Sequence, residues 1–150
     1  CDFFAYNSRL DTIQAAVANY KLKNKLNNIT KKRINNAKQL DSLLKKNHFV
    51  NTVKRDKNLK EVFHLYQVNV TKNRDQLIKY LKSKNIDAKV HYPIPIHLQK
   101  AAKFLKYKKG DFPVAEFMAK TSVSLPVHEY INSKDVLHMA STINNFYNVK

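Results

Sequence analysis

The stretch VFHLYQVNV, residues 62–70, decides the fold that we expect for this chain. Alternation of side chains between two faces, in a segment rich in valine and aromatic residues, is typical of a β-strand. The residues expected on one face are Val62, His64, Tyr66, Val68 and Val70. We therefore predict a strand over 62–70.

Helices and two more strands are predicted after this strand. Asn73 begins a short helix, with Gln76 at its capping-box position, and Asn85 can end that helix in the left-handed conformation. The segments DAKVHYP (87–93) and SVSLPV (122–127) are the further strands. This order predicts a small three-stranded, mostly antiparallel sheet covered by helices, an α+β arrangement.

The first of the two later helices begins near Pro113, and the second begins at Ser133, which is its predicted cap. Their apolar residues recur at helical spacing, so we expect these to face the core. The expected inward positions are Val114, Phe117, Met118 and Thr121 in the first, and Val136, Leu137, Ala140, Ile143 and Phe146 in the second.

Two helices are predicted before the first strand, over 8–20 and 23–46, and an irregular segment over 48–60. Ser8, with Asp11 three positions later, loosely matches a capping box. Both helices carry an apolar stripe, which we interpret as core packing, and the second has a Lys- and Asn-rich face for solvent.

The net charge of +17 raises the question of nucleic-acid binding. Lysine supplies 24 of the 28 basic residues and arginine only four, although arginine is the usual bidentate partner of bases and phosphates. The lysines are spread along the chain and accompanied by 17 asparagines. A basic nucleic-acid-binding module therefore stays an alternative and is not the main hypothesis.

Several classes of site lack their sequence pattern. The six histidines do not fall at metal-ligand spacing, and one glycine cannot form a Gly-rich phosphate loop. Cys1 is the only cysteine, so no internal disulfide forms, which fits a reducing, cytoplasmic location. No apolar run is long enough for a membrane span. The opening CDFFAYNSRLD resembles the middle of a domain, so we expect a preceding portion.

Four ordered motifs resemble those of the nucleotide-sugar aminotransferases of the DegT/DnrJ/EryC1/StrS family. They are YNSRLDTIQAAV (6–17), VHYPIPIHLQ (90–99), GDFPVAE (110–116) and SLPVH (124–128). The resemblance implies the C-terminal portion of an enzyme with the aspartate-aminotransferase fold. It places the end of a large cofactor-binding domain at 1–22, a connecting helix and loop at 23–60, and a small C-terminal domain at 61–150.

The resemblance also implies the chemistry. Such enzymes convert a keto-sugar on a nucleoside diphosphate into an amino-sugar, typically with glutamate as amino donor, and they use pyridoxal 5'-phosphate (PLP) in a homodimer. A lysine of the large domain forms the Schiff base with PLP. No lysine of this chain has a matching motif, so we name no catalytic residue and expect the fragment alone to be inactive.

Five residues are candidates for binding. By analogy Asn7 contacts the cofactor phosphate of the partner subunit, and Arg9 the substrate pyrophosphate. Pro93 and Pro95 keep the next segment extended, so that His91, Tyr92 and His97 can meet a diphosphate or a sugar hydroxyl. If the chain is extended there, His91 and Tyr92 point to opposite faces.

Three other histidines and two further functions have alternative interpretations. We interpret His64, His128 and His138 as structural or surface residues. A dehydratase of the same family, which uses pyridoxamine phosphate (PMP) and a histidine in place of the lysine, is an alternative. So is an inactive remnant that only pairs with a partner; for the isolated chain we expect exposed apolar stripes on the helices of 8–46.

Overall fold

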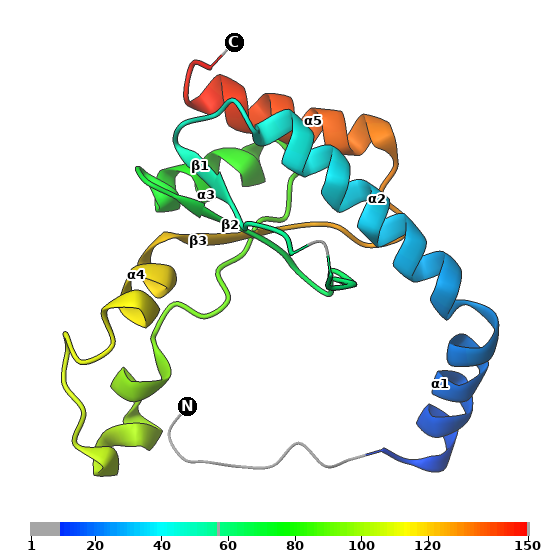
Figure 1. Ribbon diagram of the computed structural model, residues 1–150, viewed down its shortest axis with the longest axis horizontal. Coiled ribbons are helices and arrows are strands. Elements are labelled where there is room, and N and C mark those ends of the chain that lie inside the picture. The colour runs from blue at the N-terminus through cyan, green and yellow to red at the C-terminus, as the bar shows by residue number, and fades with distance from the viewer. Residues whose placement is uncertain (1–9, 57, 150) are drawn as a thin grey trace.

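Strand β2 (Tyr66–Val70) is the middle strand of a three-stranded sheet (Figure 1). A computed structural model of the chain describes residues 10–56 and 58–149. Strands β1 (Val50–Thr52) and β3 (Ser122–Leu125) flank β2, and both pair with it antiparallel. The predicted antiparallel sheet covered by helices is confirmed.

The strands themselves differ in part from the prediction. β1 lies in the segment predicted to be irregular, whereas residues 87–93 contribute a single bridge, between Lys89 and Ser124. Beyond that bridge the carbonyl of His91 accepts a hydrogen bond from the Gln67 side chain at 2.9 Å. The Gln67 side chain thus bonds a carbonyl that the backbone N–H of a neighbouring strand would otherwise bond. The backbone pairing between the two segments ends there.

β2 also begins four residues later than predicted. Phe63 has φ 52°, in the left-handed region, and this conformation breaks the alternation at the start of the predicted strand. Phe63 is buried like Tyr66, whereas His64, which was predicted to share the face of Tyr66, is exposed. From Tyr66 onward the alternation holds, with Tyr66, Val68 and Val70 buried.

The helices lie close to their predicted positions. They are α1 (Thr12–Asn24), α2 (Leu26–Leu44), α3 (Arg74–Ser83), α4 (Pro113–Thr121) and α5 (Ser133–Phe146), with two short 3-10 helices, η1 (Ile96–Leu98) and η2 (Lys100–Leu105). No helix within the described residues has both the length and the apolar character needed to span a bilayer.

The helix ends differ in detail from the prediction. Asp11 is the N-cap of α1, and Asn132, not Ser133, caps α5 in a capping box with Asp135. Ser8 lies outside the described residues. Asn73 precedes α3 without a side-chain cap bond. Asn85 has φ 61°, as predicted for a left-handed helix end.

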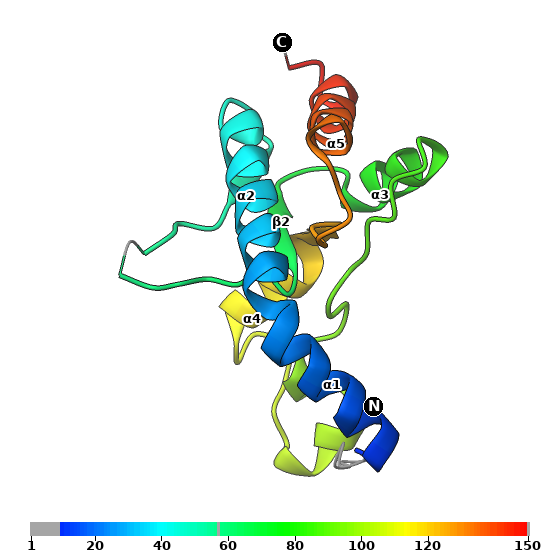
Figure 2. The same cartoon turned by 90° about the vertical axis from the view of Figure 1, so that its right-hand side faces the viewer.

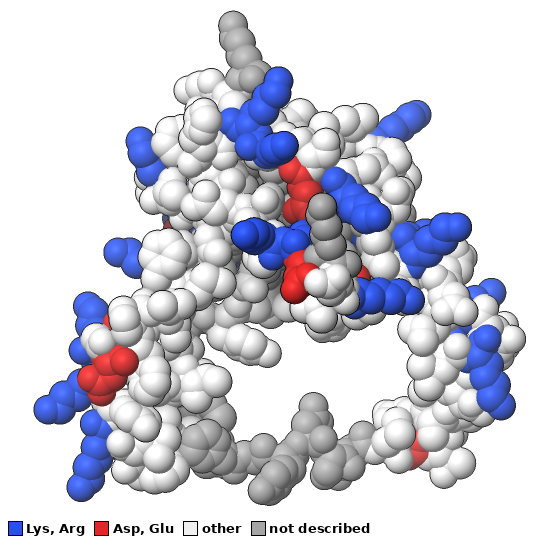
Figure 3. Space-filling view, viewed as in Figure 1, with Lys and Arg blue, Asp and Glu red and all other residues white. Residues whose placement is uncertain are grey.

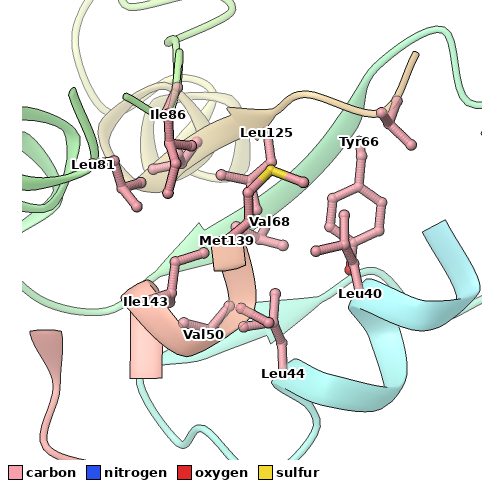
Figure 4. Close-up of a cluster of buried hydrophobic side chains, with 14 of the residues drawn as sticks. Leu40, Leu44, Val50, Tyr66, Val68, Leu81, Ile86, Leu125, Met139 and Ile143 are labelled. Carbon is pink, nitrogen blue, oxygen red and sulfur yellow. The ribbon is translucent and has the colours of Figure 1, made fainter. Parts of the chain in front are cut away.

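Helices α2, α3 and α5 form the core with one face of the sheet. Figure 4 shows side chains of α2 and α5 meeting those of the strands in one cluster. Its fully buried members include Leu40, Leu44, Tyr66, Val68, Leu77, Leu81, Val136 and Ile143. Residues of α2 and residues from 66 onward share this core. The division into 1–22, 23–60 and 61–150 stays a prediction.

The other face of the sheet is polar. Gln67 and Asn69 of β2 project to it, and Ser122 and Ser124 of β3 lie in register with them. Thr121, at the end of α4, donates to Asn69 at 3.3 Å. A buried polar face of this kind holds hydrogen-bonding groups in fixed positions, which suits a ligand-binding site.

Two limbs extend from the same side of the core (Figures 1 and 2). One is α1, and the other is the arm, which we define as residues 93–112. α1 buries no residue, and Ile13 and Val17 of its apolar stripe are 78% and 51% exposed. The core-packing interpretation is therefore wrong for α1 in this chain and right for α2, where Ala37, Leu40 and Leu44 are buried.

Three apolar residues of the later helices were also wrongly assigned to the core. Val114 and Phe117 of α4 are 75% and 52% exposed, and Leu137 of α5 is 53% exposed. Helical periodicity identifies the apolar side of a helix, but the neighbours that cover that side belong to the tertiary structure.

Candidate functional site

A groove of about 370 Å³ opens beside the polar face of the sheet. Three imidazoles line it, from His64 before β2, His91 after the bridge, and His128 after β3. Asp87 and Lys89 form a salt bridge of 2.8 Å at the same groove. We call this the histidine groove; its remaining lining is Arg33, Leu65, Ser124, Leu125, Pro126 and Val127.

His91 is the most firmly placed of the three imidazoles. Its Nδ1 lies 3.1 Å from the hydroxyl oxygen of Ser124, a buried residue whose backbone pairs with Lys89. Gln67 donates to the carbonyl of His91. With Nδ1 engaged, Nε2 is the ring atom of His91 that can bond a ligand.

Two side chains of α2 hold the other walls of the groove. Arg33 donates to Glu129 through Nε and Nη2, at 3.3 and 3.1 Å, and through Nη1 to the carbonyls of Phe63 and His64. The buried Asn36 amide donates to the carbonyl of His128 at 3.3 Å. The backbones that carry His64 and His128 are thus fixed to one helix.

Tyr92 and His91 lie next to each other. The predicted opposite orientation depended on a continuous strand, and the strand pairing ends at Lys89. The rings of His91 and Tyr92 are instead 6.1 Å apart and nearly perpendicular, and Tyr92 is 75% exposed. An exposed phenol beside a half-buried imidazole leaves both groups accessible to a ligand.

His97 is placed differently. It is buried in η1, with its Nε2 3.0 Å from Oε1 of Glu116, and the ring of Phe112 is 4.8 Å away. The backbone N–H of Gly110 donates to the same carboxylate oxygen at 2.7 Å; this bond, together with His97, holds the pKa of Glu116 below its ordinary value. His97 is not part of the histidine groove, and its contact with substrate stays a prediction.

Asn7 and Arg9 lie outside the described residues. Their predicted roles at the cofactor phosphate and the pyrophosphate are therefore untested by the structure. Of the five candidate residues, the structure brings His91 and Tyr92 together and places His97 in the arm.

A larger groove of about 1010 Å³ lies between α2 and residues 53–63. At its wall Arg55 forms salt bridges with Asp41 at 3.2 Å and Glu61 at 2.9 Å. The hydroxyl of Tyr66 donates to Asp41 at 2.8 Å, and burial, followed by this bond, raises the pKa of that phenol. These polar groups satisfy one another and hold the 53–63 segment to the core, which is a structural role.

The described basic residues lack one feature that favours nucleic-acid binding, a set of free arginines. On the face of the molecule that Figure 3 draws, lysine and arginine side chains are dispersed over the core and both limbs. The three described arginines are occupied within the protein: Arg33 and Arg55 as above, and Arg74 by Asp75 and the carbonyl of Ala119. None of the three presents a free guanidinium fork for a base or a phosphate.

The described residues do not by themselves form a PLP site. Every lysine that the structure describes is exposed, whereas a Schiff-base lysine is held in an enclosed site. Within the same residues, no three His, Cys, Asp or Glu side chains group to hold a metal ion.

Sequence reasoning missed the roles of Arg33, Asn36, His64 and His128 at the groove. His64 was predicted to share a strand face with Tyr66, and it was interpreted, like His128, as a structural or surface residue. Ser124 could have been identified, since the alternation in SVSL opposes serines to apolar residues. The contacts of Arg33 span 30 to 96 positions, and no local pattern signals them.

The sequence of this chain matches the model of the DegT/DnrJ/EryC1/StrS aminotransferase family over residues 2–144. The chain belongs to this family. A family match of this length covers every helix and strand from α1 to β3 and most of α5.

Two curated relatives illustrate the similarity. The chain is 36% identical over 144 residues to the "Pleiotropic regulatory protein" of Geobacillus stearothermophilus, covering 95% of this chain and 38% of the relative. It is 34% identical over 146 residues to dTDP-3-amino-3,6-dideoxy-alpha-D-galactopyranose transaminase of Aneurinibacillus thermoaerophilus, covering 96% and 38%. The chain therefore spans about 38% of the length of these relatives.

Two solved structures share the fold of this chain. DesV of S. venezuelae superposes with a TM-score of 0.86 at 29% identity, over 93% of this chain and 37% of DesV. The sugar aminotransferase Spr1654 of Streptococcus pneumoniae, solved in a PMP form and a PLP form, has TM-scores of 0.82 and 0.83 at 21% identity; both forms cover 96% of this chain and 37% of Spr1654. The helices and small antiparallel sheet thus match part of the fold-type I aminotransferases.

Proposed function

We propose that the intact protein is a PLP-dependent sugar aminotransferase, to which this chain contributes the small domain and its connecting helices. The observation that carries the proposal is the family match over residues 2–144. The chain corresponds to little more than a third of its relatives, so the activity is proposed for the intact protein and not for the chain alone.

The proposed substrates are a keto-sugar linked to a nucleoside diphosphate and glutamate as amino donor. Support comes from the relatives, which include a dTDP-linked amino-sugar transaminase. The intact protein is proposed to be cytoplasmic and a homodimer. The dimer follows from the predicted contact of Asn7 with the cofactor phosphate of the partner subunit, with Arg9 near the same site.

PLP, when bound, supplies the electron sink for exchanging an amino group with a keto group. Since the described lysines are exposed, the Schiff-base lysine is proposed to lie in the remainder of the intact protein. In the proposal, Asn7 donates to the cofactor phosphate and Arg9 neutralises the substrate pyrophosphate. A short side-chain amide is a suitable neutral donor to a phosphate oxygen.

The described residues are proposed to bind and orient the substrate. His91 presents Nε2, with its ring orientation set by Ser124, and Tyr92 presents its hydroxyl beside it. His97 is proposed to support substrate binding by holding the arm (residues 93–112) in place, because its Nε2 is bonded to Glu116. A pre-oriented donor loses little conformational entropy on binding, which favours affinity.

Spectrophotometry of the intact protein tests the proposal. We expect visible cofactor absorbance that bleaches when glutamate is added, and formation of an amino-sugar detected by mass spectrometry. Absence of cofactor absorbance would contradict the proposal. Absorbance without amino transfer, but with loss of water from the sugar, would identify the family's dehydratase chemistry instead.

A matched pair of variants tests the predicted cofactor residue. We expect Asn7→Ala to weaken PLP binding about tenfold, the effect of one lost hydrogen bond to a charged group. Asn19→Ala, in the exposed part of α1, is the control and leaves PLP binding unchanged. Equal affinities in the two variants would remove Asn7 from the site.

A further inference from the structure

We propose that a lysine-lined groove on α2 is a docking surface for an acidic segment of a partner protein, one that carries glutamate or aspartate together with apolar side chains. This surface, the lysine groove, consists of the groove of about 1010 Å³ between α2 and residues 53–63 and an adjoining groove of about 450 Å³ along α2. It shares no lining residue with the histidine groove and is independent of the proposed function.

The two parts of the lysine groove form one extended surface. Ile34 and Lys38 line both parts. Lys31, Ile34, Asn35 and Lys38 recur at helical spacing, which places them on the side of α2 that faces away from the core. From Lys31 to Lys38 the helix rises about 10 Å, so this side presents charge over two turns.

The lysine groove carries positive charge that nearby carboxylates do not neutralise. The lysines of the chain are dispersed, but five of them line this surface: Lys31, Lys32, Lys38, Lys54 and Lys60. All five are exposed, and among the described residues none of their side chains forms a salt bridge. A row of uncompensated charges attracts a ligand of the opposite sign and orients it.

The carboxylates that line the same groove are engaged elsewhere. Asp41 and Glu61 both bond Arg55, at 3.2 and 2.9 Å. Asp56 accepts a hydrogen bond from the backbone N–H of Asn58 at 2.9 Å. These contacts hold the 53–63 segment in place and leave the lysines available to a partner.

Apolar side chains lie between the lysines. Leu59 is 72% exposed and Val53 is 44% exposed, and the half-buried Ile34 joins the two parts of the groove. Exposed apolar surface bordered by charge is typical of protein interaction sites. A peptide in which acidic and apolar side chains alternate can satisfy both the lysines and this apolar surface.

A nucleic acid fits the lysine groove less well. Among the described lining residues the only arginine is Arg55, and its guanidinium is bonded to two carboxylates. Phe63 is the only aromatic residue of that lining and is 7% exposed, so bases have no free ring on which to stack. A single phosphate would pair with only part of the lysine row. The combination of charge and apolar surface therefore favours an acidic peptide.

Fluorescence anisotropy with the intact protein tests the inference. The probe is a short labelled synthetic peptide in which single leucines separate pairs of glutamates. A peptide with serine in place of leucine and a single-stranded oligodeoxythymidylate are the comparison ligands. Salt is kept at about 50 mM, where screening is weak. Because a basic protein binds any acidic polymer to some extent, the two lysine variants compared carry the same change in net charge.

Lys31→Glu combined with Lys38→Glu is expected to weaken binding of the leucine–glutamate peptide about tenfold, because attraction becomes repulsion at two positions. Lys79→Glu combined with Lys82→Glu, at exposed positions of α3, is the matched control and should change binding by less than about twofold. Leu59→Ser should weaken binding about threefold through lost apolar contact. The serine-containing peptide should bind the wild type correspondingly more weakly.

Three outcomes would overturn the inference. Equal losses in the two double variants would show that the peptide responds to overall charge and not to a site. Unchanged affinity in Leu59→Ser would remove the apolar contact. Tighter binding of the oligodeoxythymidylate than of the peptide, with the same dependence on Lys31 and Lys38, would identify a nucleic-acid surface instead.

Lysine acetylation followed by mass spectrometry tests whether the groove is open in the intact protein. Lys31 and Lys38 should react as readily as Lys79 and Lys82 in the protein alone, and more slowly when the leucine–glutamate peptide is present. Slow reaction of Lys31 and Lys38 without peptide would show that the remainder of the protein covers the groove, which would also overturn the inference. Cofactor absorbance and amino transfer are measured separately, so failure of docking leaves the proposed function standing.

Discussion

The guanidinium of Arg33 lies 3.1 Å from a carboxylate oxygen of Glu129, 96 positions later in the chain. Both side chains are mostly buried, at 22% and 18% exposure. A hydrogen bond from its own backbone, followed by Arg33, holds the pKa of Glu129 below its ordinary value. Since Arg33 also bonds the carbonyls of Phe63 and His64, one side chain joins α2 to both sides of the histidine groove.

Arg33→Ala is expected to lower the free energy of unfolding by about 2 kcal/mol, because it removes charge-assisted bonds in a partly buried site. Arg33→Lys should recover less than half of this loss, since an ammonium cannot reproduce the guanidinium fork. Urea unfolding measures both, and NMR should show altered His64 and His128 ring signals. Lys32→Ala, at the neighbouring exposed position, is the control; equal stability of Arg33→Ala and Lys32→Ala would contradict the expectation.

Tyr66→Phe is expected to destabilise the protein by about 1 to 2 kcal/mol, because the phenol is buried and its bond to Asp41 is lost. The free energy of unfolding in urea measures the change. Tyr130→Phe is the matched control, since Tyr130 is 84% exposed. A loss of similar size in both variants would show that the bond to Asp41 contributes nothing specific.

Glu116 is expected to make stability depend on pH at the acid side. Its pKa in the folded protein is below the ordinary value of 4.5, mainly through the Gly110 N–H and then through His97. A depressed carboxyl pKa gives stability that is present above 4.5 and is lost as the pH falls through the lower, folded value. Urea unfolding from pH 6 downward should therefore show a smaller acid-side loss in Glu116→Gln than in the wild type. Glu61→Gln is the control, because Glu61 is a carboxylate that bonds Arg55 and not Gly110 or His97. An unchanged dependence of stability on pH in Glu116→Gln would contradict the expected contribution of Glu116.

The exposed stripe of α1 is expected to cause self-association of the 150-residue chain. Ile13→Gln combined with Val17→Gln should reduce association measured by sedimentation, since contiguous exposed apolar surface promotes it. The free energy of unfolding should change by less than about 0.5 kcal/mol, as for other exposed substitutions. Asn19→Gln on the same helix is the control. A wild-type chain that sediments as a monomer at all concentrations would refute this expectation.

Sequence periodicity predicted the elements whose partners are local. The alternation from Tyr66 to Val70, the apolar stripe of α2, the left-handed Asn85 and the helix start at Pro113 were all predicted correctly. In each case the signal is a spacing or a backbone preference of a few neighbouring residues, which the tertiary structure does not override.

The histidine groove could be predicted only in part. Of its three histidines, His91 was named from a motif, whereas His64 and His128 were not, because Phe63 adopts a left-handed conformation and Arg33 reaches across the fold. β1 was missed because a three-residue strand carries too little alternation to be recognised. The exposed residues of α1 and α4 show the same limit: an apolar pattern does not say which surface covers it.

Gly110 is the chain's only glycine, and its φ is +101°. Five other described residues are left-handed with φ of 52° to 61°, and three of them are asparagines: Phe63, Asn73, Asn85, Lys106 and Asn148. Asparagine tolerates that narrower region but not the angle at Gly110, and the absence of any atom within 4 Å of an added Cβ shows that backbone and not space is limiting. A library that replaces every turn residue in this protein should thus find many interchangeable positions and one intolerant one, at the base of the segment that seats His97.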